Sequence, residues 1–243
     1  MSNHSDPTVW PLWATAFATF FLAAVAALQD LIRDALKKPR LVIKYRQEPP
    51  MFRRSAKRFL VGEQVIVGPC FDIHLLLANE GKGRARDVEA YLVAIWQYDY
   101  SDGRLKPLSD FWPVRLRYDS EGTRSIDLIP ESQPEYWNLA YIPNPKLVTY
   151  LKGDNFVDVP GAEGDWIRVY LDLLDHPFYQ PNMLVPGRWV LKVSVYSENA
   201  RRADAFLDIR WTGQWHDDEK QMLEDLRVVL LDPESSSRLS PAS

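Results

Sequence analysis

The chain contains one cysteine, Cys70, and four histidines among its 243 residues. A single thiol cannot form an internal disulfide or a cysteine-based metal cluster. The histidines, His4, His74, His176 and His216, are too widely spaced for the H-E-x-x-H pair of zinc hydrolases. The sequence also lacks a G-x-S-x-G elbow and a Walker A loop. We therefore predict a protein that is not an enzyme and needs no metal or cofactor.

One group of residues keeps a hydrolase as an alternative hypothesis. Asp172, Asp175 and His176 lie within five residues of one another, and two carboxylates with an imidazole can hold a divalent cation. No further ligands flank them, which is more typical of a strand end followed by a His-Pro turn. Cys70 lies beside Pro69 without a basic neighbour, which indicates a buried thiol rather than a nucleophile.

Basic residues are fewer than acidic ones over the whole chain, whose net charge is -4 with a pI near 5.6. This balance argues against a general nucleic-acid binder, so we predict no nucleic-acid partner. The segment from Val9 to Leu28 has no charged residue at all. Twenty apolar residues at a rise of about 1.5 Å each are long enough to span the hydrocarbon core of a bilayer. We predict a short N-terminal tail over residues 1–8 and a transmembrane helix with its juxtamembrane extension over 9–38.

Two other interpretations of this segment are less consistent with its flanks. A signal peptide requires basic residues before the apolar run, and none precedes Val9. A buried helix of a soluble core would carry a polar stripe, whereas only Thr15 and Thr19 interrupt this one.

Basic residues gather on the C-terminal side of the apolar segment. They are Arg33, Lys37, Lys38, Arg40, Arg53, Arg54, Lys57 and Arg58. The N-terminal side has only the amino group, His4 and Asp6, so the positive-inside rule predicts a single-pass protein of the inner (cell) membrane with a cytoplasmic soluble domain. The same cations are candidates for contact with anionic lipid of the bilayer. The alternative is that they act only as the topology signal in a solvated linker.

The rest of the chain is predicted to be mostly β, an antiparallel β-sandwich with a short C-terminal helix. Strand-like runs recur between turn signals, and helical patterns are scarce before an acidic start at Asp217. We expect a first strand and a basic linker over 39–62, a sandwich over 63–231 with a long insert around 101–183, and a disordered tail over 232–243. The main strands are expected at 41–45, 71–78, 87–98, 188–196 and 205–211, with a last one at 228–231.

Two motifs within this region resemble immunoglobulin-like bacterial domains of the CARDB type. Asn79 and Gly81, followed by Ala85 and Val88, fit the N-x-G-x-x-x-A-x-x-V hairpin of such domains. The run from Pro186 to Val195 is similar to the P-G-x-aromatic-x-L-x-V strand near their end. The resemblance covers about a quarter of the soluble part and implies adhesion, scaffolding or interaction. The segment 101–183 exceeds what a compact sandwich needs and folds either into the sandwich or beside it.

Aromatic residues are the best candidates for a binding surface. Trp112, Tyr136 and Trp137 lie in the long insert, where exposed rings suit a ligand or a protein partner; the alternative is that they fill the core. We predict a membrane-tethered, non-enzymatic interaction or scaffold domain that docks a cytoplasmic partner or a second copy of itself. The alternatives are a ligand-sensing membrane effector of a bacterial defence-type system and, with reversed topology, an exported carbohydrate-binding or adhesion domain.

Overall fold

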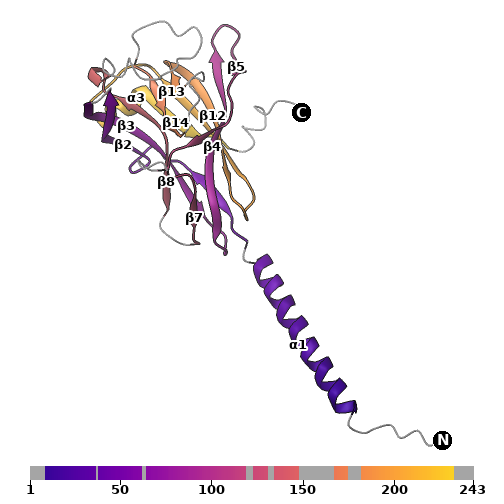
Figure 1. The fold of residues 1–243 in the computed structure, drawn as a ribbon. Helices are drawn as coiled ribbons and strands as arrows, with labels where there is room; N and C mark the ends of the chain where they lie inside the picture. The colour runs from indigo at the N-terminus through magenta and orange to yellow at the C-terminus, as the bar shows by residue number, and fades with distance from the viewer. Residues whose placement is uncertain are drawn as a thin grey trace, which may run out of the picture.

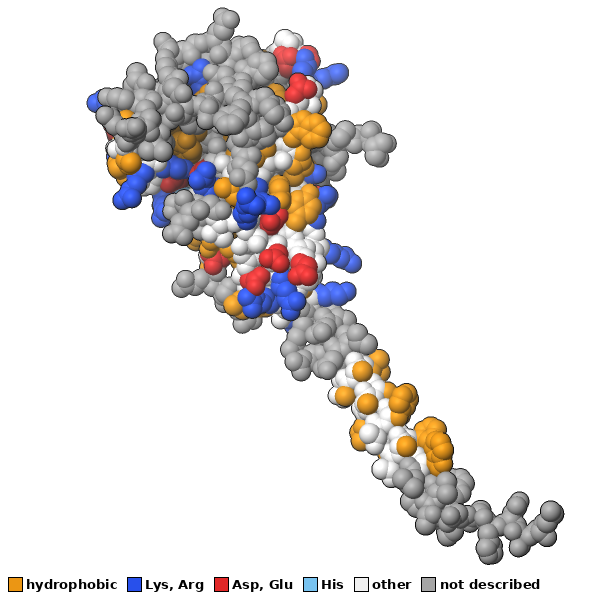
Figure 2. Space-filling model, viewed as in Figure 1, with side chains coloured by type: hydrophobic (Ala, Val, Ile, Leu, Met, Phe, Trp, Pro, Cys, Tyr) orange, Lys and Arg blue, Asp and Glu red, His pale blue; other side chains and the backbone are white. Residues whose placement is uncertain are grey.

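The N-terminal helix stands apart from the rest of the molecule. The computed structural model describes residues 9–36, 38–61, 64–118, 123–130, 134–147, 167–174 and 182–232. Helix α1 (Val9–Leu36) projects away from the β domain, as Figure 1 shows. Its rings face solvent: Trp13, Phe17, Phe20 and Phe21 are 63–74% exposed. Figure 2 shows apolar side chains along the described part of this helix, and the side chains from Trp13 to Gln29 are exposed except for the half-buried Val25.

The transmembrane helix predicted over 9–38 is not confirmed. Within the part of the chain that the structure describes, no helix combines the length and the apolar character needed to cross a membrane.

The β domain consists of two antiparallel sheets. The six-stranded sheet has the order β1-β3-β8-β9-β11, with β2 paired to the end of β3. Its strands are β1 (Leu41–Lys44), β2 (Phe52–Val61), β3 (Gln64–Asn79), β8 (Glu135–Pro143), β9 (Val169–Leu171) and β11 (Met183–Leu184). The eight-stranded sheet has the order β10-β6-β4-β12-β13-β14, with β5 and β7 also paired to β4. Its strands are β4 (Ala85–Asp99), β5 (Arg104–Pro107), β6 (Val114–Leu116), β7 (Ile126–Leu128), β10 (Leu173–Leu174), β12 (Gly187–Tyr196), β13 (Ala203–Trp211) and β14 (Leu226–Leu230).

One core lies between the two sheets. Phe71, Ile73 and Leu75 of β3 face Trp189 and Leu191 of β12 within the same buried cluster. These side chains are fully buried, and each burial stabilises the fold by about 1.5–3 kcal/mol. Side chains along β3 and β12 point alternately into the core and outward, and this alternation produces the strand pattern of their sequences. The prediction of a mostly β, sandwich-like antiparallel fold is thus confirmed.

The basic linker predicted within residues 39–62 is wrong for its second half, which forms β2. Ten residue pairs join β2 to β3, from Phe52 opposite Ile73 to Val61 opposite Gln64. A turn at the cis Pro49–Pro50 bond precedes β2, which runs antiparallel to β3 as β1 does. The buried ring of Phe52 then stacks on Phe71 with 5.4 Å between centroids. Packing of this one ring and pairing with β3 outweigh the charged composition that favoured a linker.

The described parts of the long insert 101–183 belong to both sheets. Strands β5, β6 and β7 pair with β4, and β8 lies between β3 and β9. Of the two alternatives, folding into the sandwich therefore holds for these residues.

The turn after β3 holds the chain that leaves α1. The side-chain oxygen of Asn79 accepts hydrogen bonds from the backbone N–H of Arg40 at 3.1 Å and of Gly81 at 3.0 Å. Its amide nitrogen donates to the carbonyls of Gly83 and Leu128. A Cβ at Gly81 would lie 2.4 Å from both Arg40 N and Lys38 O, so only glycine fits there. The Asn-x-Gly pattern thus fixes the segment that follows the helix.

The C-terminal helix forms where the acidic start at Asp217 predicts it. Helix α3 (Glu219–Asp225) begins after Asp218, whose carboxylate accepts from the backbone N–H of Lys220 and Gln221. Such an N-cap contributes about 1 kcal/mol. Strand β14 follows directly and forms the edge of its sheet. Gln47 lines this edge: its side chain donates to Leu226 O and accepts from Val228 N.

Candidate binding groove

Three arginines lie side by side on the outer face of the eight-stranded sheet. Along β12 and β13, the residues opposite those of the core point outward. The register places Arg188 of β12 opposite Arg210 of β13, and Arg210 opposite Arg227 of β14. Like charges directly opposite on neighbouring strands destabilise a sheet. We call this set the arginine row.

A single buried carboxylate compensates part of this charge. Asp208 of β13 accepts from Arg188 Nε at 3.0 Å and from Arg188 Nη2 at 2.9 Å. Arg210 Nη2 reaches the same carboxylate at 3.3 Å. The hydrogen bond to Asp208 raises the pKa of Arg188, against the opposing effect of partial burial. Asp208 therefore holds the guanidinium of Arg188 through two N–H groups, and that of Arg210 through only one.

Two tyrosines extend the row on the β4 side. The guanidinium of Arg188 lies over the Tyr98 ring at 5.4 Å, within the range of a cation–π contact. Tyr100 packs edge-on against Tyr98 with 4.9 Å between centroids, and it is 73% exposed. An exposed ring held by another ring is a ready surface for an apolar group.

These residues line a groove of about 690 Å³. Its walls are completed by Pro186, Gly187, Trp211, Thr212, Glu224 and Asp225. Asp225 is engaged by the Thr212 hydroxyl and by His216 Nε2, at 2.5 and 2.7 Å. We call the groove formed by the arginine row, Tyr98 and Tyr100 the arginine–tyrosine groove. It combines cations, rings and two acids at its rim.

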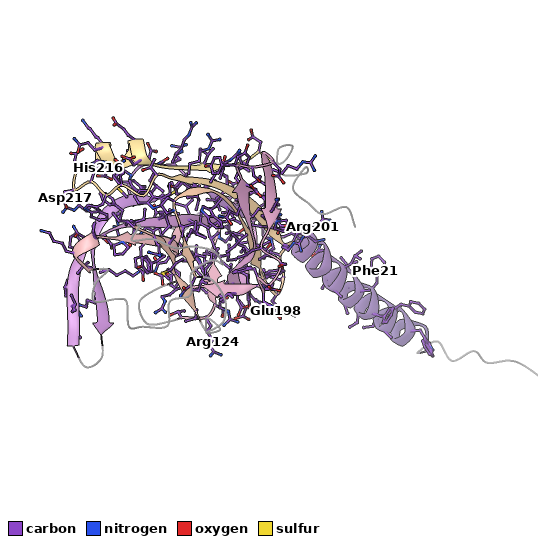
Figure 3. All side chains as sticks on the ribbon, turned by 90° about the horizontal axis from the view of Figure 1, so that it is seen from above. Phe21, Arg124, Glu198, Arg201, His216 and Asp217 are labelled. Atoms are coloured by element: carbon purple, nitrogen blue, oxygen red, sulfur yellow. The ribbon has the colours of Figure 1, made fainter. Side chains whose placement is uncertain are left out.

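The groove lies away from α1. Arg188 is the second residue of β12, and Tyr196 is its last. Next to Tyr196, Ser197 donates to Arg86 O, close to the β3–β4 turn that holds the chain leaving α1. Eight residues of strand correspond to about 25 Å. Figure 3 shows His216 and Asp217 at the opposite end of the domain from the end where α1 leaves. A partner can therefore reach the groove without meeting the helix.

A second polar cluster lies on the outer face of the six-stranded sheet. Ser55 Oγ contacts both Asp72 Oδ2 and Cys70 Sγ, and His74 Nε2 is 3.8 Å from Asp72. Burial raises the pKa of the Cys70 thiol to about 12, helped by the charge of Asp72. Burial acts to raise the pKa of Asp72 too, but the contacts with His74, Ser55 and the Lys57 charge hold it below its ordinary value. The thiol is thus kept protonated, as the sequence predicts for a buried cysteine.

Asp172 is part of an ion pair. Its carboxylate accepts from Lys57 Nζ and lies 3.2 Å from Arg117 Nε, while Lys57 also lies over the Tyr141 ring at 3.8 Å. Asp175 and His176, the other members of the alternative metal site, lie outside the described residues. Across the described ranges, no three His, Cys, Asp or Glu side chains gather as a metal site requires.

The residues predicted to contact lipid do not form one surface. Lys38 and Arg40 are exposed beside the helix exit, whereas Lys37 and the side chain of Arg33 lie outside the described part. In the register of β2 and β3, Arg53 lies opposite Asp72 and Arg58 lies opposite Val67. These positions are about 20 to 40 Å along β3 from Asn79 and the exit of α1. Arg54 forms an ion pair with Asp217, and Lys57 forms one with Asp172. The four cations of β2 thus lie away from Lys38 and Arg40, and their contact with lipid stays a prediction.

The predicted aromatic residues are also separated. Trp112 is 67% exposed, Tyr136 is half-buried and Trp137 is fully buried. Trp137 packs against Tyr118 in the core, with 5.5 Å between ring centroids. The structure thus places Trp137 in the core, as the alternative interpretation has it. The rings that line the groove are the half-buried Tyr98 and the exposed Tyr100.

The arginine row has no signal in the linear sequence. Its members are 22 and 17 residues apart, and only the strand register brings them together. No family model, characterised protein or solved structure matches the chain. The resemblance to CARDB-type domains therefore stays a prediction.

Proposed function

We propose that this protein is a membrane-anchored, non-enzymatic interaction module that binds a protein partner through the arginine–tyrosine groove. The observation that carries the proposal is the arginine row with Tyr98 and Tyr100 on an open sheet face. Arginine, tyrosine and tryptophan are the residues that dominate binding energy at protein interfaces.

The anchoring part of the proposal rests on α1. An isolated helix with rings that are 63–74% exposed leaves a large apolar surface in water, which favours association with an apolar phase. We propose a lipid bilayer as the apolar phase with which this surface associates. The flank charges of the sequence favour a cytoplasmic domain, so the groove would face the cytoplasm.

The proposal is tested in cells by two measurements on the full chain. A photo-cross-linking amino acid at Tyr100 is expected to give one discrete protein adduct, and the same substitution at Tyr196 is the matched control. Tyr196 is exposed at the other end of β12. Equal adducts at both positions, or none at Tyr100, would contradict docking at the groove.

Anchoring is tested separately by fractionation and by C-terminal reporters. We expect the chain to stay in the membrane pellet after alkaline carbonate extraction and a GFP fusion to fluoresce. Release by carbonate would contradict anchoring. Alkaline phosphatase activity without fluorescence would place the domain outside and favour the exported alternative.

A second function, the ligand-sensing effector, is favoured by one observation. The groove volume of about 690 Å³ lies within the roughly 300–1,000 Å³ of small-molecule sites. A cell extract freed of protein that raises the melting temperature of the wild type, and not of an Arg227→Gln variant, would support this function over a protein partner.

A further inference from the structure

We infer that Arg210 and Arg227 bind carboxylates of an acidic protein segment, while Arg188 acts as a positioning residue. This inference rests on the proposed function, since it names the chemistry by which the groove recognises its partner. The two docking arginines share one sheet register, on β13 and β14, and both are exposed.

The assignment of roles follows from which guanidinium groups are already engaged. Arg188 uses both Nε and Nη2 on Asp208 and lies against Tyr98. Arg210 makes one contact of 3.3 Å with the same carboxylate. Arg227 has no carboxylate within ion-pair distance among the residues that the structure describes. Arg210 and Arg227 therefore keep donors for an incoming oxyanion.

The electrostatics of the row also favour an anion. Cross-strand neighbours lie about 4.5–5.5 Å apart at Cβ, so three guanidinium groups in sequence repel one another. Asp208 compensates Arg188 and, through one contact of 3.3 Å, part of the charge of Arg210, which leaves Arg227 without a carboxylate partner among the residues that the structure describes. A second carboxylate between Arg210 and Arg227 would accept hydrogen bonds from these two residues and compensate their charge, as Asp208 does for Arg188.

Two neighbours of the row favour a protein segment over a phosphate or lipid headgroup. Glu224 and Asp225 line the same groove and repel a phosphate, which concentrates up to two negative charges on one group, more strongly than a single carboxylate. The exposed ring of Tyr100 provides surface for an apolar side chain next to the carboxylate. A segment in which acidic and apolar residues alternate complements both features.

The test uses the full chain in lipid nanodiscs and a fluorescein-labelled peptide, Gly-Glu-Leu-Glu-Leu-Glu-Gly, followed by fluorescence anisotropy. We expect saturable binding that Arg210→Gln and Arg227→Gln each weaken by about tenfold, as loss of a charge-assisted contact predicts. Arg227→Lys keeps the charge without the planar fork and should weaken binding less than Arg227→Gln. Arg202→Gln, which removes an exposed cation paired with Asp204 at the other end of β13, is the charge-matched control and should leave the affinity within about twofold.

Three outcomes would overturn the inference. They are the absence of saturable peptide binding by the wild type, equal effects of Arg202→Gln and Arg227→Gln, and displacement of the peptide by inorganic phosphate at an equal concentration of anionic groups. If the peptide fails while the Tyr100 cross-link persists, the groove docks a partner of other chemistry and only the carboxylate assignment is wrong. If the cross-link is also lost, the proposed function fails with it.

Discussion

Arg188 of β12 and Asp208 of β13 are joined by two hydrogen bonds, of 3.0 Å from Nε to Oδ1 and 2.9 Å from Nη2 to Oδ2. The carboxylate is buried, while the guanidinium is partly open to solvent and borders the groove. One pair thus links the packing of the sheet to the charge of the arginine–tyrosine groove, and the two roles can be separated by mutation.

Asp208→Asn is expected to lower stability and raise the affinity for the acidic peptide. The variant loses the charge that compensates Arg188 and Arg210, which should cost about 1–3 kcal/mol of unfolding free energy. The same change releases donors of both arginines for an incoming carboxylate. Denaturant unfolding and peptide anisotropy measure the two effects. Asp204→Asn removes a more exposed acid at the far end of β13 and is expected to leave peptide affinity unchanged; a loss of affinity in Asp208→Asn would contradict the role given to Arg188.

Trp137→Ala should destabilise the fold by about 3–5 kcal/mol, because it removes a fully buried ring from the core. Trp112→Ala, at a residue that is 67% exposed, should change stability by less than about 0.5 kcal/mol. Urea unfolding followed by circular dichroism measures both variants. Similar effects of the two substitutions would show that Trp137 is not the core residue described above.

Cys70 is expected to be unreactive in the folded protein. Because burial raises its pKa to about 12, only a fraction of order 10⁻⁴ is thiolate at pH 8, and the thiolate is the reactive form. Its rate of reaction with a disulfide reagent should rise about tenfold per pH unit while the fold persists, and denaturation should restore the rate of a free thiol. Stoichiometric labelling within minutes at pH 8 under native conditions would contradict the buried environment.

Gln47→Ala should expose the edge of β14. The Gln47 amide satisfies the carbonyl of Leu226 and the N–H of Val228, so its loss should cost about 1–2 kcal/mol. The amide hydrogen of Val228 is expected to exchange faster in the variant, and that of Leu207 in the core of β13 should not. Gln47→Asn, one methylene shorter, serves as the matched variant, because it keeps the amide but cannot reach both groups. Unchanged exchange at Val228 in Gln47→Ala would show that water or a rearranged edge replaces the contact.

Those parts of the fold that depend on local pattern could be predicted from the sequence. The runs 71–78, 188–196 and 205–211 alternate or are uniformly apolar and form the centres of β3, β12 and β13. The acidic start at Asp217 marks the helix that Asp218 caps. In these cases one strand or one turn of chain carries its own signal.

Features that depend on pairing could not be predicted. Strand β2 carries four of the basic residues that favoured a linker, and it exists because β3 extends far enough to pair with it. The groove requires the register of β12, β13 and β14, which no single segment contains. Trp137 and Tyr98 are equally aromatic in sequence, and only the face of the sheet on which each falls makes one a core residue and the other a groove residue.

The hydrogen bonds around Asn79 also determine how the domain responds to mechanical load. Arg40 is bonded through its N–H to Asn79 and through its carbonyl to Glu80 N, and β1 continues from it antiparallel to β3. A pull on Arg40 in the direction of β1 therefore acts in shear, and the bonds of the β1–β3 ladder share the load instead of opening one after another. A displacement of Arg40 is therefore passed directly to β3, which lies between β1 and β8 in the six-stranded sheet.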